Sequence, residues 1–194
     1  MFTGIIENTG IVEDVIQTGS NKTFWISSLL SNDLKVDQSL SHNGVCLTVE
    51  EIKGDSHRVT AIDETLLKTT LSSWEKGSVI NLERCMQLNG RLDGHIVQGH
   101  VDCVAECISI IINEGSWEYQ FKFDEKFTKL IIEKGSVCIN GTSLTAYNVS
   151  KNAFCVGIIP YTYHNTNIKN IAANSIVNIE FDMLGKYVAR FFGN

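Results

Sequence analysis

The sequence has no excess of positive charge and no long apolar run. It contains 16 lysines and arginines against 22 aspartates and glutamates, which gives a net charge of -6, and the basic residues are scattered singly. This pattern disfavours a phosphate-backbone partner. No stretch approaches the roughly 20 apolar residues of a membrane span, and the first residues lack the basic, then apolar pattern of a secretion signal. We therefore expect a cytoplasmic protein that binds neither nucleic acid nor membranes.

Motifs for nucleotides and metals are missing as well. The glycines at 90, 94 and 99 belong to no strand–loop–helix unit with a P-loop lysine or a dinucleotide spacing. Two histidines and two cysteines between residues 95 and 107 do not have the spacing of paired zinc ligands, and strand alternation places His95 and His100 on opposite faces. Without a secretion signal, the 6 cysteines are expected to be free thiols. We expect no metal and no cofactor.

What the sequence does contain is a duplication. Shifting the first half by about 97 residues superimposes it on the second half without a gap, and so long a period indicates a whole-domain repeat. The matches cluster where residues 42–49 meet 139–146, 64–65 meet 161–162 and 81–83 meet 178–180. Cys46 of the first copy meets Ser143 of the second. Two similar domains follow, with a junction near residues 89–91.

Local patterns predict strands, tight turns and one short helix in each copy. Apolar and polar residues alternate over 119–124 and 154–158, as in a strand with one buried face. Asn-Gly pairs at 43–44 and 140–141 lie between apolar runs and mark equivalent hairpin turns. Phe127, Leu130 and Ile131 have helical spacing, with Gly135 as a left-handed end. We predict an all-β fold of two closed or nearly closed antiparallel barrels.

The segment from 183 to 192 has helical periodicity beyond the second barrel. Leu184, Val188, Phe191 and Phe192 share one face of the predicted helix. This apolar face requires a cover. The helix either packs back on its own barrel or mediates oligomerisation.

Several polar residues within the repeats have two interpretations. Cys46 follows a turn in an apolar run, where cysteine is often a small buried hydrophobe. Glu64, Asn81 and Glu83 either bind a ligand in a pocket or lie on solvated strand faces. Recurrence or replacement between the copies is what makes these residues candidates for a site.

The chain resembles the riboflavin synthase family over nearly its whole length. Four motifs match in order and spacing, at residues 1–6, 43–49, 94–100 and 141–145. The resemblance implies two tandem six-stranded barrels, at 1–89 and 90–182, each binding one lumazine, and an oligomerisation helix at 183–194. It also implies a homotrimer, with the active site between the first barrel of one subunit and the second barrel of its neighbour, and allows association with lumazine synthase.

The implied reaction is a transfer that uses no cofactor. Two molecules of 6,7-dimethyl-8-ribityllumazine give riboflavin and 5-amino-6-ribitylamino-pyrimidinedione when one donates a four-carbon unit to the other. Holding both reactants in one site makes their encounter internal. Proton loss from a 7-methyl group would be assisted by His100, Ser143 and Thr145, while Cys46 would attack C7 of the second ring or orient a water.

The resemblance also implies roles for further residues. The expected catalytic set is Cys46, His100, Ser143, Ser39, Thr145, Asp182 and Phe2, with the alternative that Phe2 only plugs a barrel. The expected substrate-binding set is Thr3, Gly4, Ile5, Thr48, Val49, Ala61, Ile62, Glu64, Thr65, Asn81, Gly99, His100, Val101, Lys134, Gly141, Ser143, Thr145, Gly157, Ile159, Tyr161, Thr162 and Asn178.

The second copy departs from the family pattern at Asn140 and Thr142, where aspartate and isoleucine are expected, and at residues 163–165. These departures bear on affinity rather than fold. The first rival is a lumazine or flavin antenna protein, which would bind without synthesis. A flavin reductase barrel would need a nicotinamide-binding α/β domain, for which there is no sequence. A purely structural duplicated barrel would show no affinity for lumazines.

Overall fold

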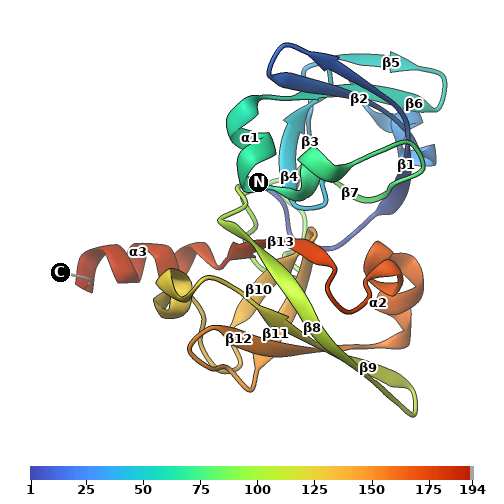
Figure 1. Ribbon diagram of the computed structural model, residues 1–194. Helices are drawn as coiled ribbons and strands as arrows, with labels where there is room; N and C mark the ends of the chain where they lie inside the picture. Colours follow the sequence, from blue (N-terminus) through green and yellow to red (C-terminus); the bar gives the residue numbers. More distant parts are fainter. Residues whose placement is uncertain (193–194) are drawn as a thin grey trace.

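The first half of the chain folds into one antiparallel sheet. The computed structural model describes residues 1–192, and Figure 1 shows its two halves stacked on one another with the N-terminus between them. The sheet order is β4-β3-β7-β1-β2-β6-β5. Its strands are β1 (Asn8–Thr18), β2 (Asn21–Ser27), β3 (Ser39–His42), β4 (Val45–Thr48), β5 (Glu51–Lys53), β6 (Ser56–Ala61) and β7 (Val79–Arg84). The short helices are η1 (Leu29–Asp33), α1 (Asp63–Lys68) and η2 (Thr70–Ser73).

The second half repeats these elements as a closed barrel, with the order β10-β11-β12-β9-β8-β13. Its strands are β8 (Cys103–Asn113), β9 (Ser116–Lys122), β10 (Ser136–Ile139), β11 (Thr142–Tyr147), β12 (Ala153–Ile158) and β13 (Ile176–Phe181). The helices are η3 (Glu125–Leu130), α2 (Pro160–Asn165), η4 (Asn167–Asn170) and α3 (Met183–Phe192).

The prediction of two barrels is confirmed, with a difference in the first. There the segment 45–53 forms two short strands, of which β4 pairs with β3 and β5 pairs with β6. Between them Val49 is fully buried and the Glu50 amide donates to the Arg58 carbonyl at 2.9 Å. One segment thus forms both edges of the sheet, which is curved but not closed by a continuous ladder.

The predicted gap-free repeat is wrong for the first two strands. β1 and β8 begin at residues 8 and 103, a shift of 95, whereas β3 and β10 begin at 39 and 136, a shift of 97. Equivalent bulges at Val12/Asp14 and Cys107/Ser109 keep the shift of 95. The two additional residues of the second copy lie in the connection around η3, outside the strand ladders, so they disturb no pairing.

The predicted strands and turns are confirmed, but each copy has three short helices where one was expected. Residues 119, 121 and 123 are buried, and both Asn-Gly pairs have positive φ at each residue, as the tight turns require. The helix expected near Phe127 is the 3₁₀ helix η3. The left-handed residue after it is Lys134 (φ 62°) and not Gly135; Lys134 donates its amide to the Ala146 carbonyl at 2.8 Å, which fixes this turn.

Each barrel has its own apolar core, and a network of buried asparagines joins them. Asn81 Nδ2 donates to the Asn140 carbonyl, and Asn178 Nδ2 donates to the Asn43 carbonyl, both at 2.9 Å. Asn167 Nδ2 adds a bond to Asn43 Oδ1 at 2.9 Å. Because these side chains are buried and hydrogen-bonded, the interface fixes the orientation of one barrel on the other.

The C-terminal helix α3 extends away from the second barrel (Figure 1). No residue of α3 is buried among those the structure describes, and its apolar side chains include Phe191 and Phe192 at 79% and 85% exposure. Lys186 is tied to Asp102 by an ion pair of 2.6 Å. Residues 193–194 of the predicted helical segment lie outside the described part. Among the helices of residues 1–192, none is long and apolar enough to cross a membrane.

Candidate active site

Two cavities lie at equivalent places in the two barrels. We call them the first-barrel and the second-barrel cavity, and their volumes are about 250 and 510 Å³. The first-barrel cavity is lined by Val45, Cys46, Glu64, Thr65, Lys68, Thr69, Gly99, His100 and Val101. The second-barrel cavity is lined by Ile5, Asp93, Gly94, Lys134, Ser136, Ser143, Leu144, Thr145, Tyr147, Gly157, Ile159 and Thr162.

The repeat relates three residues in the wall of the first-barrel cavity to three in the wall of the second. Cys46 on β4 corresponds to Ser143 on β11, and Thr65 on α1 corresponds to Thr162 on α2. His100 in the first-barrel cavity corresponds to Ile5 in the second, at the shift of 95. The chain therefore builds one type of cavity twice and gives each copy its own reactive side chain.

Two segments, residues 2–4 and 97–99, pass beside these cavities, and we call them the straps. Phe2 and Val97 pair with each other through amide–carbonyl bonds of 2.7 and 3.0 Å. The Gly4 carbonyl accepts from the Ser143 amide at 2.8 Å, and the Gly99 carbonyl accepts from the Cys46 amide at 2.9 Å. Each strap thus belongs to the opposite barrel's cavity, which couples the two halves of the chain.

Glycine is required at the end of each strap. Gly4 and Gly99 have φ of 77° and 81°, and a Cβ at either would lie 2.6 Å from the Cβ of Ser143 or Cys46 respectively. Real Cβ atoms do not approach so closely, and positive φ is costly for other residues. The two glycines allow the backbone to reach the reactive side chains.

A buried glutamate anchors each strap. Glu83 accepts from the amides of Thr3 and Gly4 at 2.6 and 3.0 Å, while Glu180 accepts from three amides of residues 98–100 at 2.6 to 2.9 Å. Burial raises the pKa of both carboxyls, and the amide hydrogen bonds counteract it. Glu83, a sequence candidate for ligand binding, holds the strap in place.

The Cys46 thiol is half-buried and protonated at neutral pH. Desolvation raises the pKa of Cys46 from 9.0, and a hydrogen bond with Ser39 partly counteracts this. A thiol in this state can donate a hydrogen bond or orient a water more readily than it can attack as a thiolate. Ser39, expected to support the site, lies beside Cys46.

His95 is the residue that sequence reasoning missed. Its Nδ1 lies 2.6 Å from Ser143 Oγ, and the side chain is 7% exposed. Burial lowers the pKa of His95, opposed by the Asp182 carboxylate nearby. The sequence signal was its position in the glycine-rich 94–100 motif, but no local pattern indicates a hydrogen bond to a distant strand.

Several predicted residues lie away from both cavities. Asn81 and Asn178 are buried in the barrel interface, with Gly141 beside Gly44. Val49 and Ala61 belong to the first core. Phe2, a strap residue, is buried in one cluster with Val97 and Cys138. Thr48, Ile62 and Tyr161 are exposed on the barrel surface.

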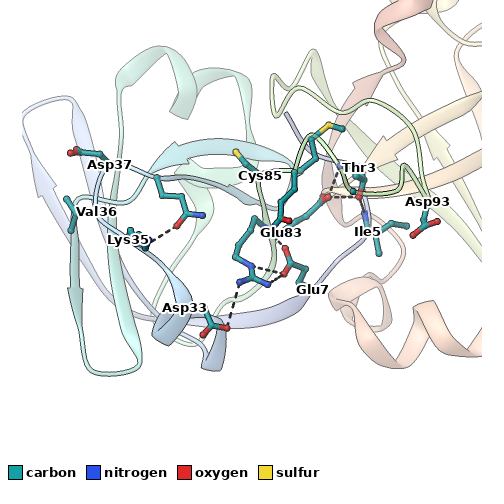
Figure 2. Close-up of a pocket in the computed structure, with 15 residues that line it drawn as sticks. Thr3, Ile5, Glu7, Asp33, Lys35, Val36, Asp37, Glu83, Cys85 and Asp93 are labelled. Carbon is teal, nitrogen blue, oxygen red and sulfur yellow. Dashed lines mark hydrogen bonds and ion pairs between the residues drawn. The ribbon is translucent and has the colours of Figure 1, made fainter.

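A third cavity of about 790 Å³ lies beside the N-terminal segment. Arg84 forms ion pairs with Glu7 and Asp33 in its wall, and Figure 2 shows Thr3 hydrogen-bonded to Glu83. It shares Ile5 and Asp93 with the second-barrel cavity. None of the predicted catalytic side chains lines it, so its size does not make it the reaction site.

Comparison with known proteins places both barrels in one family. The lumazine binding domain matches residues 3–85 and again 98–182. Riboflavin synthase of Bacillus amyloliquefaciens is 40% identical over 192 residues, 98% of this chain and 89% of that protein. The Saccharomyces cerevisiae riboflavin synthase is 37% identical over 203 residues, covering 98% and 85%.

Solved structures share the fold at lower identity. LumP complexed with riboflavin superimposes with a TM-score of 0.87 and 23% identity, covering 93% of this chain and 99% of that one. LumP complexed with 6,7-dimethyl-8-(1'-D-ribityl) lumazine gives 0.84 and 23%, covering 93% and 98%. At this identity the likeness concerns the fold.

Proposed function

Since this chain belongs to the riboflavin synthase family, we propose that it converts two molecules of 6,7-dimethyl-8-ribityllumazine into riboflavin and 5-amino-6-ribitylamino-pyrimidinedione. The chain is an enzyme, a transferase, and the group it moves in this proposal is a four-carbon unit. We place the reaction in the cytoplasm.

The observation that carries the proposal is the pair of equivalent cavities. A reaction between two copies of one molecule needs two similar binding places, and the duplicated barrels supply them. The copies must also play different parts, one donating and one accepting carbon. The replacement of Cys46 by Ser143, and of His100 by Ile5, supports such a division.

In the proposed mechanism the protein aligns the ligands and handles protons. His100 takes or returns the proton of a 7-methyl group, since its side chain lines the first-barrel cavity. Cys46, with Ser39 beside it, activates or orients the attacking group at C7. Ser143, Thr145 and Asp182 serve the second-barrel cavity.

The assigned residues that line the cavities hold the ligands in this proposal. The cavity walls contribute Glu64, Thr65 and Val101 in the first barrel, and Lys134, Ile159 and Thr162 in the second. Phe2 anchors its own strap by packing against Val97 and Cys138. The exposed Ile62 precedes α1 and the exposed Tyr161 lies in α2, and in this proposal a neighbouring subunit covers both.

We further propose a homotrimer whose active sites lie between subunits. The exposed apolar face of α3 supports assembly, because side chains such as Phe191 and Phe192 are rarely left in water as a group. The first-barrel cavity of one subunit would then face the second-barrel cavity of its neighbour.

The rival function is binding without synthesis, and the fold shared with LumP makes it the alternative to test. The test is to incubate the purified protein with 6,7-dimethyl-8-ribityllumazine alone and follow riboflavin absorbance. The proposal predicts one riboflavin for every two lumazines consumed. Tight binding with no product would make the protein an antenna, and no binding would leave only the fold assignment.

A further inference from the structure

The Ser143 side chain lies against Gly4, Gly94 and His95 and borders the second-barrel cavity. Its amide donates to the Gly4 carbonyl at 2.8 Å. A Cβ added at Gly4 would lie 2.6 Å from Ser143 Cβ, and one added at Gly94 would lie 2.9 Å from the same atom. His95 Nδ1 is 2.6 Å from Oγ.

His95 is itself held firmly in place. Its amide donates to the Thr3 carbonyl at 3.1 Å, next to the pairing of the two straps. The imidazole is 7% exposed. Backbone pairing and burial hold the ring with Nδ1 towards Ser143.

The unpaired ring nitrogen indicates where the proton is. Nε2 of His95 is buried without a hydrogen-bond partner among the described residues. A buried N–H without an acceptor is rarer in proteins than a buried acceptor without a donor. The tautomer with the proton on Nδ1 avoids the orphaned N–H, and its Nδ1–H then donates to Ser143 Oγ.

We propose that His95 is a positioning residue that donates its Nδ1–H to Ser143 and thereby turns the Ser143 hydroxyl proton towards the second-barrel cavity. There the hydroxyl donates to an acceptor of the bound heterocycle, a carbonyl oxygen or a ring nitrogen. The identity of that heterocycle rests on the proposed function; the orientation of the hydroxyl does not.

This arrangement distinguishes the second cavity from the first. The counterpart of Ser143 is Cys46, and the histidine lining that cavity, His100, has Ile5 as its counterpart. The second-barrel cavity thus presents a fixed hydroxyl donor, whereas the first presents a thiol and an exposed imidazole. Two identical ligands would meet different hydrogen-bonding partners.

The direct test is the tautomer of His95 in the full-length protein labelled with ¹⁵N-histidine. Two-dimensional ¹H–¹⁵N spectra separate the two neutral tautomers and the imidazolium, and His95→Asn identifies the signals of His95 by their loss. We expect a neutral ring protonated on Nδ1 at about pH 7. A proton on Nε2, or an imidazolium, overturns the proposal whether or not the protein makes riboflavin.

The functional test compares variants that keep or remove the donor. The side-chain amide that His95→Asn introduces can replace the Nδ1–H, whereas His95→Ala removes it. We expect His95→Ala to weaken lumazine binding in the second-barrel cavity by about tenfold, the ratio that 1.4 kcal/mol produces, and His95→Asn to recover most of it.

A double-mutant cycle with Ser143→Ala checks that His95 acts through Ser143. We expect no further loss when His95→Ala is added to Ser143→Ala, while the exposed-site variant His164→Gln binds as the wild type does. Additive losses, or wild-type binding by His95→Ala, overturn the proposal. Wild-type protein that binds lumazine but produces no riboflavin would reject the proposed function alone.

Discussion

Cys46 and Ser143 occupy one position in two copies of a fold, and each has different neighbours. The amide of each residue donates a hydrogen bond to a strap carbonyl. Cys46 has Ser39 beside its side chain, whereas Ser143 has His95. The duplication predicted this correspondence. The histidine partner of Ser143 was not predictable, because the strap pairing that delivers it is absent from any local pattern.

Cys46→Ser should retain the fold and lose turnover by about tenfold or more, because the hydroxyl differs from the thiol in size, acidity and nucleophilicity. The change also places the second copy's residue type in the first cavity. Steady-state riboflavin formation measures the effect. Cys85→Ser, which can keep its bond to the Ser39 carbonyl, serves as the matched control, and equal rates for the two variants would contradict a role for Cys46.

A buried chain of hydrogen bonds through two histidines distinguishes the first core from the second. His42 Nδ1 donates to the Leu40 carbonyl at 3.0 Å, so its Nε2 must accept from His57 Nε2 at 2.9 Å, and His57 Nδ1 accepts from Ser31 at 2.8 Å. The corresponding residues of the second barrel, Ile139 and Phe154, are apolar. Both rings are therefore neutral in the folded protein.

This chain of hydrogen bonds should make the stability of the folded protein sensitive to acid. Burial lowers the pKa of His57 from 6.5 to about 4 and that of His42 well below 6.5. Because the histidine pKa is lower in the folded state, the unfolded state binds the proton at a higher pH than the folded state does. Stability is therefore complete above about pH 6.5 and falls towards pH 4, by roughly 3 kcal/mol for His57 from its shift at 1.36 kcal/mol per unit.

The variant that combines His42→Ile with His57→Phe copies the second barrel and should remove this dependence. Urea unfolding at several pH values measures it. The buried carboxyls of Glu83 and Glu180, whose pKa values are raised, titrate in both proteins and cancel in the comparison. An unchanged pH slope in the variant would show that other groups cause the acid sensitivity.

Among the elements of the fold, the straps are what convert two barrels into a site. Periodicity predicted the strands, and Asn-Gly pairs predicted the turns, because these signals are local. The straps contain three of the predicted ligand contacts, Thr3, Gly4 and Gly99, but the pairing of the straps depends on residues 95 apart. The short interruption between β4 and β5 was likewise invisible, since the whole segment has a strand-like sequence.

Gly4→Ala should lower the free energy of unfolding by more than the positive φ alone explains, because the added Cβ would clash with Ser143. Gly19 provides the control, since its φ is 61° and no atom lies within 4 Å of the place that an added Cβ would occupy. Gly19→Ala should lose about 1 kcal/mol from positive φ, while Gly4→Ala loses more and also turnover. Chemical denaturation and a riboflavin-formation assay compare the stability and turnover of the two variants. Equal losses of stability in both would contradict the close approach of Gly4 to Ser143.

In the molecule as a whole, the asparagine interface joins the barrels and α3 remains uncovered. Sequence reasoning assigned Asn81 and Asn178 to ligands because they recur, but recurrence also arises when a repeat contacts its own copy across a pseudo-twofold axis. Their amide groups each bond to the opposite barrel's turn. Recurrence therefore identified important residues while leaving their role open.

If the proposed trimer assembles through α3, replacing Leu184 and Val188 with lysine should leave a folded monomer that has lost most turnover. Both side chains are exposed in the single chain, at 67% and 56%, so the change costs the monomer little. Ile112→Lys, at a position 75% exposed on β8, is the control. Sedimentation of the α3 variant at the wild-type mass would contradict assembly through this helix.

The proposed function requires that two copies of one lumazine react in the two cavities. A mixture of unlabelled lumazine and lumazine carrying ¹³C in its transferable four-carbon unit tests it by mass spectrometry of the riboflavin formed. We predict three mass classes, with none, one or both four-carbon units labelled, and the mixed class twice as abundant as either other class when equal amounts are supplied. Riboflavin without a mixed class would contradict the proposed function, because its carbon would not then come from two separate lumazine molecules.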